Sequence, residues 1–174
     1  MPGRSPSQTV GPFFSEALRW RDGHVVAFAE PRGERVVLEG RVLDGAGAPV
    51  GDALVETWQL SPAGAPPGPA KGDANPHGFG RVGTAADGSF RIETAMPGGK
   101  TPPCIEVTLL ARGVLKALRT RVYLCPEAQA RADPLLAPIA SSPRFATLVA
   151  KPQAAGVWKW DVRLQGDGET VFFA

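Results

Sequence analysis

Few residues in this sequence have side chains that do chemistry, and their spacing limits what that chemistry can be. Cys104 and Glu106 stand two residues apart, so in a strand the thiol and the carboxyl group point to one face. Together they offer two ligands to a divalent metal, whereas a bound metal needs a third and usually a fourth. His24 and His77 show no ligand spacing to another such residue, so each is most simply a solvated loop residue.

The composition narrows the class of protein. The chain has 174 residues, the size of one domain, and its 21 Gly and 18 Pro predict frequent turns. Its formal net charge of +2 comes from 19 basic and 17 acidic residues spread along the sequence. No basic face or tail stands out, which argues against nucleic acid and membrane surfaces as partners.

The sequence also bears on location. No stretch approaches the roughly 20 apolar residues of a membrane span. The first ten residues, MPGRSPSQTV, lack the apolar centre of a signal peptide, so we expect a cytoplasmic protein. In that compartment Cys104 and Cys125 are expected to be thiols rather than a disulfide.

Short β-type runs separated by turn residues dominate from residue 36 onward. Asp87-Gly88 predicts a hairpin between two of these runs, Pro126-Glu127 predicts a short helix to about residue 132, and Ser142-Pro143 predicts a further helical turn. The run from 158 to 164 alternates most clearly. Strands are predicted at 36–43, 54–60, 81–84, 89–94, 105–111, 118–124 and 158–164.

Many short strands with little helical periodicity predict an all-β fold, a single-domain antiparallel β-sandwich over residues 36–174. Residues 1–35 show no sustained period and are predicted to form an arm that wraps over its own domain or docks on another chain. The Pro/Gly-rich loop at 61–80 is long enough to cover a site.

Four strings, taken together and in order, make the sequence similar to a known family along nearly its whole length. It resembles the intradiol ring-cleaving dioxygenases, and the resemblance implies a prealbumin-like β-sandwich in a hetero-oligomer of alpha-type and beta-type chains. The strings are residues 6–13 (PSQTVGPF), 56–59 (ETWQ), 78–81 (GFGR) and 165–173 (QGDGETVFF).

The resemblance also implies a ferric ion held by two tyrosines and two histidines, and this chain lacks that set. The family's histidine pair falls where this sequence has Pro103-Cys104-Ile105-Glu106. The first tyrosine would fall near Pro66, and the loop before Thr101 that would carry the second has none. One Tyr, at position 123, and two His cannot supply two of each. The iron is therefore expected on the beta-type partner, with no metal on this chain.

The resemblance assigns a different task to four residues. Thr9, Gly11 and Pro12 match an arm at the edge of the partner's catalytic pocket, and Arg112 matches an arginine facing that pocket. A Gly beside a Pro gives a thin, stiff wall for a flat ring, and Arg112 can pair with a substrate carboxylate. The implied substrates are 3,4-dihydroxybenzoate (protocatechuate) and O₂, and the implied product is 3-carboxy-cis,cis-muconate. No residue of this chain is expected to be catalytic.

Without the resemblance, these four residues have simpler interpretations. Gly11-Pro12 is then a turn, Thr9 a loop or capping hydroxyl, and Arg112 a solvated residue at a strand end. Two other functions remain open as well. The chain can be a stand-alone β-sandwich ligand-binding module that has lost dioxygenase activity, or a self-sufficient metalloenzyme using Cys104, Glu106 and a histidine.

Overall fold

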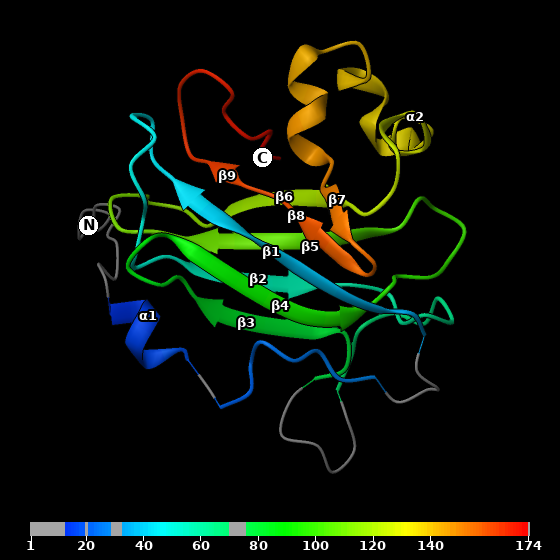
Figure 1. Ribbon diagram of the computed structural model, residues 1–174, viewed down its shortest axis with the longest axis horizontal. Coiled ribbons are helices and arrows are strands. Elements are labelled where there is room, and N and C mark those ends of the chain that lie inside the picture. Colours follow the sequence, from blue (N-terminus) through cyan, green and yellow to red (C-terminus); the bar gives the residue numbers. More distant parts are fainter. Residues whose placement is uncertain (1–12, 20, 29–32, 70–75, 174) are drawn as a thin grey trace, which may run out of the picture.

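The fold is a two-layer β-sandwich, seen here in a computed structural model that describes residues 13–19, 21–28, 33–69 and 76–173 (Figure 1). Two sheets lie face to face, which confirms the all-β class expected from the sequence. The strands in these described ranges are β1 (Arg35–Leu43), β2 (Leu54–Trp58), β3 (Phe79–Gly83), β4 (Ser89–Ala95), β5 (Cys104–Leu110), β6 (Leu118–Tyr123), β7 (Lys151–Ala154), β8 (Val157–Lys159) and β9 (Val162–Arg163).

The first sheet has the order β4-β1-β8-β7, with β9 also paired to β1, and the second has the order β3-β2-β5-β6. Most pairings are antiparallel, but β1 pairs in parallel with β8 and with β9. The core fills the space between the sheets, because each strand turns alternate apolar side chains inward. Leu38 and Ile92 from the first sheet and Val55, Ile105 and Leu109 from the second are almost fully buried there.

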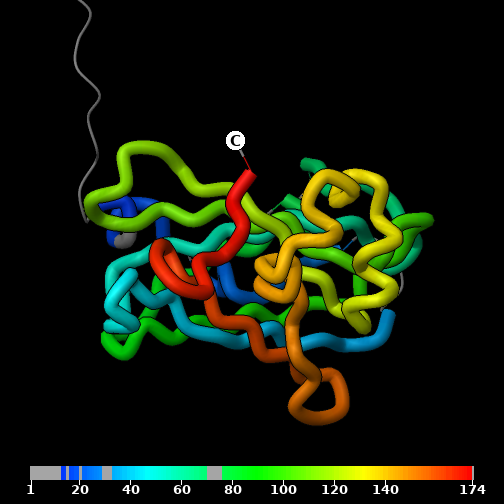
Figure 2. Tube along the Cα trace, turned by 90° about the horizontal axis from the view of Figure 1, so that it is seen from above, coloured from blue at the N-terminus to red at the C-terminus, as the bar shows by residue number. Residues whose placement is uncertain are grey.

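Short helices stand apart from the sheets. Helix α1 (Phe13–Ala17) precedes the first strand, and an insert between β6 and β7 contains α2 (Glu127–Ala130) and the 3₁₀ helices η1 (Pro134–Ile139) and η2 (Pro143–Leu148). The insert packs beside the end of β6 around Tyr123, Leu136, Phe145 and Leu148, forming a second small core (Figure 2). The helix at Pro126-Glu127 and the turn at Ser142-Pro143 are thus confirmed, whereas η1 was not expected.

The segment before β1 lies against its own domain. Val26 is buried in the main core, and its amide donates to the carbonyl of Glu93 at 2.8 Å. The amide of Glu93 donates in turn to the carbonyl of His24 at 2.8 Å, so residues 24–26 cover part of the edge of β4. Gly80 permits this contact, since a Cβ there would lie 2.9 Å from the Val26 side chain.

Two expectations about connectivity were wrong. Asp87-Gly88 does not close a hairpin, because β3 pairs with β2 in one sheet while β4 pairs with β1 in the other. The two residues instead lie in the turn by which the chain crosses between the layers, where Gly88 has a φ of 76°. Turn residues predict a reversal of direction but not which partner the next strand finds.

The segment 158–164 is not one strand, although its side chains do alternate as the sequence predicts. Trp160 and Val162 are buried and Lys159 and Asp161 exposed, but the ladder with β1 is interrupted between β8 and β9. There the Asp161 carboxylate, rather than a carbonyl, accepts the amide of Arg41 at 2.9 Å. Strand β7 was missed because its four residues are all exposed and include a proline, as only a sheet edge allows.

Candidate functional site

The place where the resemblance puts a histidine pair lies on the outer face of the second sheet. Cys104 and Glu106 point outward from β5, while Ile105 between them is buried in the core. On the neighbouring strand β6, Tyr123 stands opposite Cys104 and Arg121 stands opposite Glu106. The antiparallel register therefore adds a guanidinium and a phenol to the thiol and carboxyl group.

Arg121 is held between two carboxylates. Its side chain is 20% exposed, and it forms a short ion pair with Glu106 and a second, at 3.4 Å, with Oδ2 of Asp133. Burial alone would lower the pKa of Arg121, but hydrogen bonds to Glu106 and Tyr123 and the charge of Glu106 raise it above its ordinary value. The guanidinium is therefore a permanent positive charge at this position.

Asp133 joins this face of the sheet to the helical insert. Its side chain is 1% exposed, and its Oδ2 accepts a hydrogen bond of 2.7 Å from the Tyr123 hydroxyl. Its Oδ1 accepts the amide of Leu135 at 3.0 Å, which caps the start of η1. Burial and the contact with Asp133 raise the pKa of Tyr123, so the phenol stays protonated and donates.

These residues do not fit a ferric ion. Burial raises the pKa of the Cys104 thiol to about 11, and Glu106 is already paired with a cation. A trivalent metal there would meet the charge of Arg121 at close range, and the single tyrosine is committed to Asp133. Among the residues that the structure describes, no cluster of three His, Cys, Asp or Glu side chains forms a metal site.

Arg112 lies elsewhere, in the turn that follows β5. The amide of Val114 donates to the carbonyl of Ala111 at 3.1 Å, and Gly113 has a φ of 83°, as a tight turn with a glycine at its third position requires. The Arg112 side chain is 68% exposed, and its Nε lies 3.1 Å from Oδ2 of Asp52. Asp52 is the one ion-pair partner of Arg112 among the described residues, and a guanidinium this exposed can also take an anion.

Asp52 is the functional candidate that sequence reasoning missed. Because Leu54 of β2 pairs with Leu110 of β5, extending the register by two residues places Asp52 opposite Arg112. The turn that carries Asp52 is itself fixed, since the buried hydroxyl of Thr84 accepts the amide of Ala53 at 3.0 Å. The pairing of β2 with β5 would have revealed Asp52, but strands so far apart in sequence give no local sign of it.

The arm residues Thr9, Gly11 and Pro12 lie outside the described residues. The described residues begin at α1. This helix lies at the same end of the sandwich as the turn of Arg112 in both views (Figures 1 and 2). Phe13 is 74% exposed on α1, and Leu115 is 61% exposed two residues after Gly113. This end of the molecule therefore combines a cation with exposed apolar side chains.

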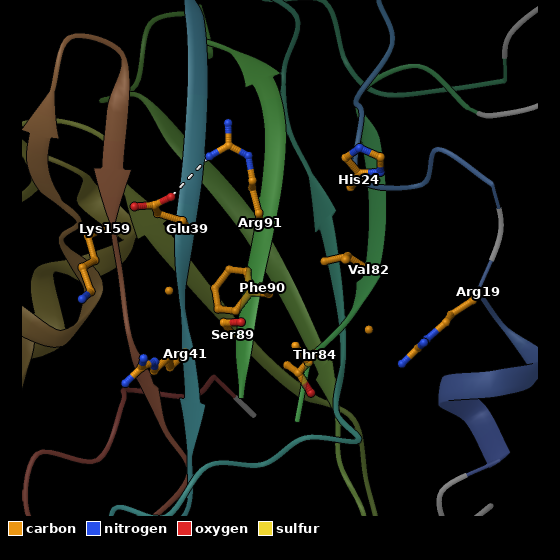
Figure 3. Close-up of a pocket in the computed structure, with 13 residues that line it drawn as sticks. Arg19, His24, Glu39, Arg41, Val82, Thr84, Ser89, Phe90, Arg91 and Lys159 are labelled. Atoms are coloured by element: carbon orange, nitrogen blue, oxygen red, sulfur yellow. Dashed lines mark hydrogen bonds and ion pairs between the residues drawn. The ribbon is translucent and has the colours of Figure 1, made fainter. Parts of the chain in front are cut away.

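A separate groove of about 610 Å³ runs across the exposed edge of β4 (Figure 3). His24, Arg19 and Lys159 line it, and its floor includes Phe90. His24 is part of the segment that covers β4, and His77 pairs through its backbone with Gly68 in the long loop. Neither the groove that His24 lines nor the small pocket that His77 lines includes Cys104, Glu106 or Arg112.

Two of the strings that prompted the resemblance maintain the fold. The rings of Trp58 and Phe79 contact each other across β2 and β3, with centroids 4.2 Å apart and planes tilted by 44°. They lie beside the ion pair of Arg81 with Glu56 at 2.6 Å. The buried amide of Gln59 donates to the carbonyl of Ala95 at 2.8 Å and so connects the two layers. The residues of these two strings therefore pack and connect the sheets, and none of them is part of a reactive site here.

The carboxyl-terminal string also has a structural task. The Thr120 hydroxyl donates to the carbonyl of Val171 at 2.7 Å, and the amide of Phe173 donates to the carbonyl of Arg119 at 2.7 Å. The tail thus follows the outer edge of β6. No helix in the described residues is both long and apolar enough to cross a membrane.

Known sequences and structures resemble this chain to different extents. Residues 9–111 match the family described as Dioxygenase. A protocatechuate 3,4-dioxygenase alpha chain of Burkholderia cepacia is 41% identical over 191 residues, covering 98% of this chain and 96% of that one. The beta chain from the same organism is 44% identical over only 80 residues, 43% of this chain and 34% of that one.

Among solved structures, 3-chlorocatechol 1,2-dioxygenase from Rhodococcus opacus superposes with a TM-score of 0.60. The identity is 18%, over 82% of this chain and 64% of that one. A likeness at that identity supports the sandwich fold and no more.

Proposed function

The chain belongs to the intradiol ring-cleaving dioxygenases, and on that premise we propose that it is the alpha-type subunit of a protocatechuate 3,4-dioxygenase. The reaction is then the opening of 3,4-dihydroxybenzoate by O₂ to 3-carboxy-cis,cis-muconate. The observation that carries this proposal is the match to an alpha chain along almost the full length of both proteins. The shorter match to a beta chain identifies the kind of partner.

We place the iron on that beta-type partner. The family uses iron, but the position that the resemblance assigns to the histidine pair holds a half-buried thiol and a carboxylate already paired with Arg121. One Tyr and two His in the whole sequence cannot form a set of two tyrosines and two histidines. The redox chemistry of ring opening then belongs to the partner's iron and the substrate.

This chain contributes charge and shape to the shared pocket. Arg112 is the proposed contact for the substrate carboxylate, because its side chain is 68% exposed and Asp52 holds it at the Nε atom. Thr9, Gly11 and Pro12 are the proposed wall against the ring. Residues 1–35 are the proposed arm, which covers β4 of its own domain with residues 24–26 and contributes to the interface. The exposed Phe13 and Leu115 at the same end suit burial against a second chain.

A cytoplasmic location is part of the proposal. Cys104 and Cys125 are free thiols in the fold, one half-buried and one buried. Reduced thiols in a domain of this size are typical of the cytoplasm.

The proposal is tested by co-expressing the chain with its beta-type partner and purifying the complex through a tag on this chain alone. We expect the partner to co-purify with iron and to cleave protocatechuate, while this chain purified alone has neither iron nor activity. Stoichiometric iron and turnover in the isolated chain would support the self-sufficient metalloenzyme. If this chain purifies as a stable monomer without the co-expressed partner, the stand-alone binding module is supported.

A further inference from the structure

Arg121 and the carboxylates around it link two parts of the fold. Arg121 touches Glu106 on the same sheet and Asp133 at the start of the helical insert. Asp133 is nearly fully buried, and a buried carboxylate is costly unless cations and hydrogen bonds surround it. Arg121, Tyr123 and the Leu135 amide supply these contacts.

A cation stands here between groups that bind divalent metals in other proteins. Glu106 and Asp133 both pair with Arg121, and Cys104 lies beside Glu106 on the same face of β5, but no three such side chains of the described residues are placed to hold a metal around it. The cation is a guanidinium, which can contact Glu106 and Asp133 at once through separate nitrogens.

We propose that the Arg121 guanidinium takes the place of a metal ion, closing this face of the chain to metal and tying the insert of residues 126–148 to the second sheet. The inference deepens the proposed function, because it says what became of the metal position in an alpha-type chain. It also explains why Asp133 both pairs with Arg121 and caps η1: one side chain anchors the insert to the cation.

The stability test compares Arg121→Met with Arg119→Met in the assembled complex and in the full chain alone. Arg119 lies two residues earlier on β6, is exposed and forms no ion pair with the described residues, so it is a matched control. We expect Arg121→Met to speed hydrogen exchange at the Leu135 amide by about tenfold or more, because it leaves Asp133 buried without its cation. Arg119→Met should leave that rate unchanged.

A second pair of variants keeps the inference testable if Arg121→Met folds poorly. Arg121→Lys retains a cation and should show an exchange rate between those of the wild type and Arg121→Met. Arg121→Met combined with Asp133→Asn removes the stranded charge and should exchange more slowly than Arg121→Met alone. Equal rates in Arg121→Met and Arg119→Met would overturn the anchoring role.

The metal test uses Zn²⁺ alone as the probe, with melting temperature and bound zinc as readouts. We expect added Zn²⁺ to bind and stabilise Arg121→Met, whose Cys104, Glu106 and Asp133 have lost their cation, and to leave the wild type unaffected. Equal zinc binding by the wild type, or none by Arg121→Met, would overturn the replacement of metal by the guanidinium. Because neither readout needs turnover or the partner, failure here is distinct from failure of the proposed function.

Discussion

Arg121 on strand β6 and Arg112 in the turn after β5 show that the same side chain can stay available to a ligand or be paired within the fold. Arg112, after β5, is 68% exposed and has one carboxylate at its Nε edge. Arg121, on β6, is 20% exposed and is bracketed by Glu106 and Asp133. A guanidinium with a free edge can bind a substrate carboxylate, whereas one with both sides paired stabilises structure.

The largest expected effect is a loss of stability, and it follows from removing Asp133, one of the two partners of Arg121. Asp133→Ala removes the partner of Arg121, the acceptor for Tyr123 and the cap of η1, and should lower the free energy of unfolding by about 3 kcal/mol. Denaturant unfolding of the full chain measures this loss. Asp167→Ala, at an exposed loop position, is the control and should change the stability by less than about 0.5 kcal/mol. A similar small loss in both variants would mean that Asp133 does not anchor the insert.

The next largest effect is a loss of activity toward protocatechuate, and it follows from removing the exposed Arg112. Arg112→Ala in the complex should lower kcat/KM for protocatechuate by roughly tenfold or more, mainly through KM, because a charge-assisted hydrogen bond is lost. Uncharged catechol should be affected far less. Lys116→Ala removes an exposed charge from the same loop and should alter neither substrate. Equal losses for protocatechuate and catechol would remove the carboxylate role.

Asp52 should show a weaker version of the Arg112 effect. Asp52→Ala frees the Nε edge without removing the guanidinium, so we expect kcat/KM for protocatechuate to fall by roughly two- to fivefold. Asp52→Asn, which keeps an acceptor oxygen, should lose less. If Asp52→Ala has the same effect on an Arg112→Ala background as on the wild type, Asp52 does not act through Arg112.

The smallest effect concerns the Cys104 thiol. Because burial raises its pKa to about 11, little thiolate is present at neutral pH. In Cys125→Ala, alkylation of Cys104 should be roughly 100-fold slower at pH 8 than after unfolding, where the thiol returns to its ordinary pKa of 9.0. The rate should rise with pH until about 11. A rate at pH 8 equal to that of the unfolded chain would contradict the protected thiol.

The sequence predicted the sandwich because alternation along strands such as β5 is a local property. Ile105 and Leu109 face inward while Cys104 and Glu106 face outward, as the period of two requires. It did not predict that β3 and β4 lie in different sheets, because turn residues such as Asp87 carry no information about distant partners.

The same limit applies to the two arginines. Arg112 was singled out by resemblance and lies exposed at a strand end, but Asp52 beside it follows only from the pairing of β2 with β5. The counts of Tyr and His argued against an iron site in this chain. They could not show that Arg121 and Asp133 form an ion pair beside Glu106. Asp133 lies in the insert between β6 and β7, which was only partly predicted.

The central claim is that this chain completes a pocket whose iron lies on another chain. It is tested most directly by titrating the isolated iron-bearing partner with this chain and measuring protocatechuate cleavage. We predict that activity rises with added chain and saturates at equimolar amounts, and that Arg112→Ala reaches a lower plateau for protocatechuate at subsaturating substrate but not for catechol. Full activity of the partner alone, or cleavage by this chain alone, would contradict the account.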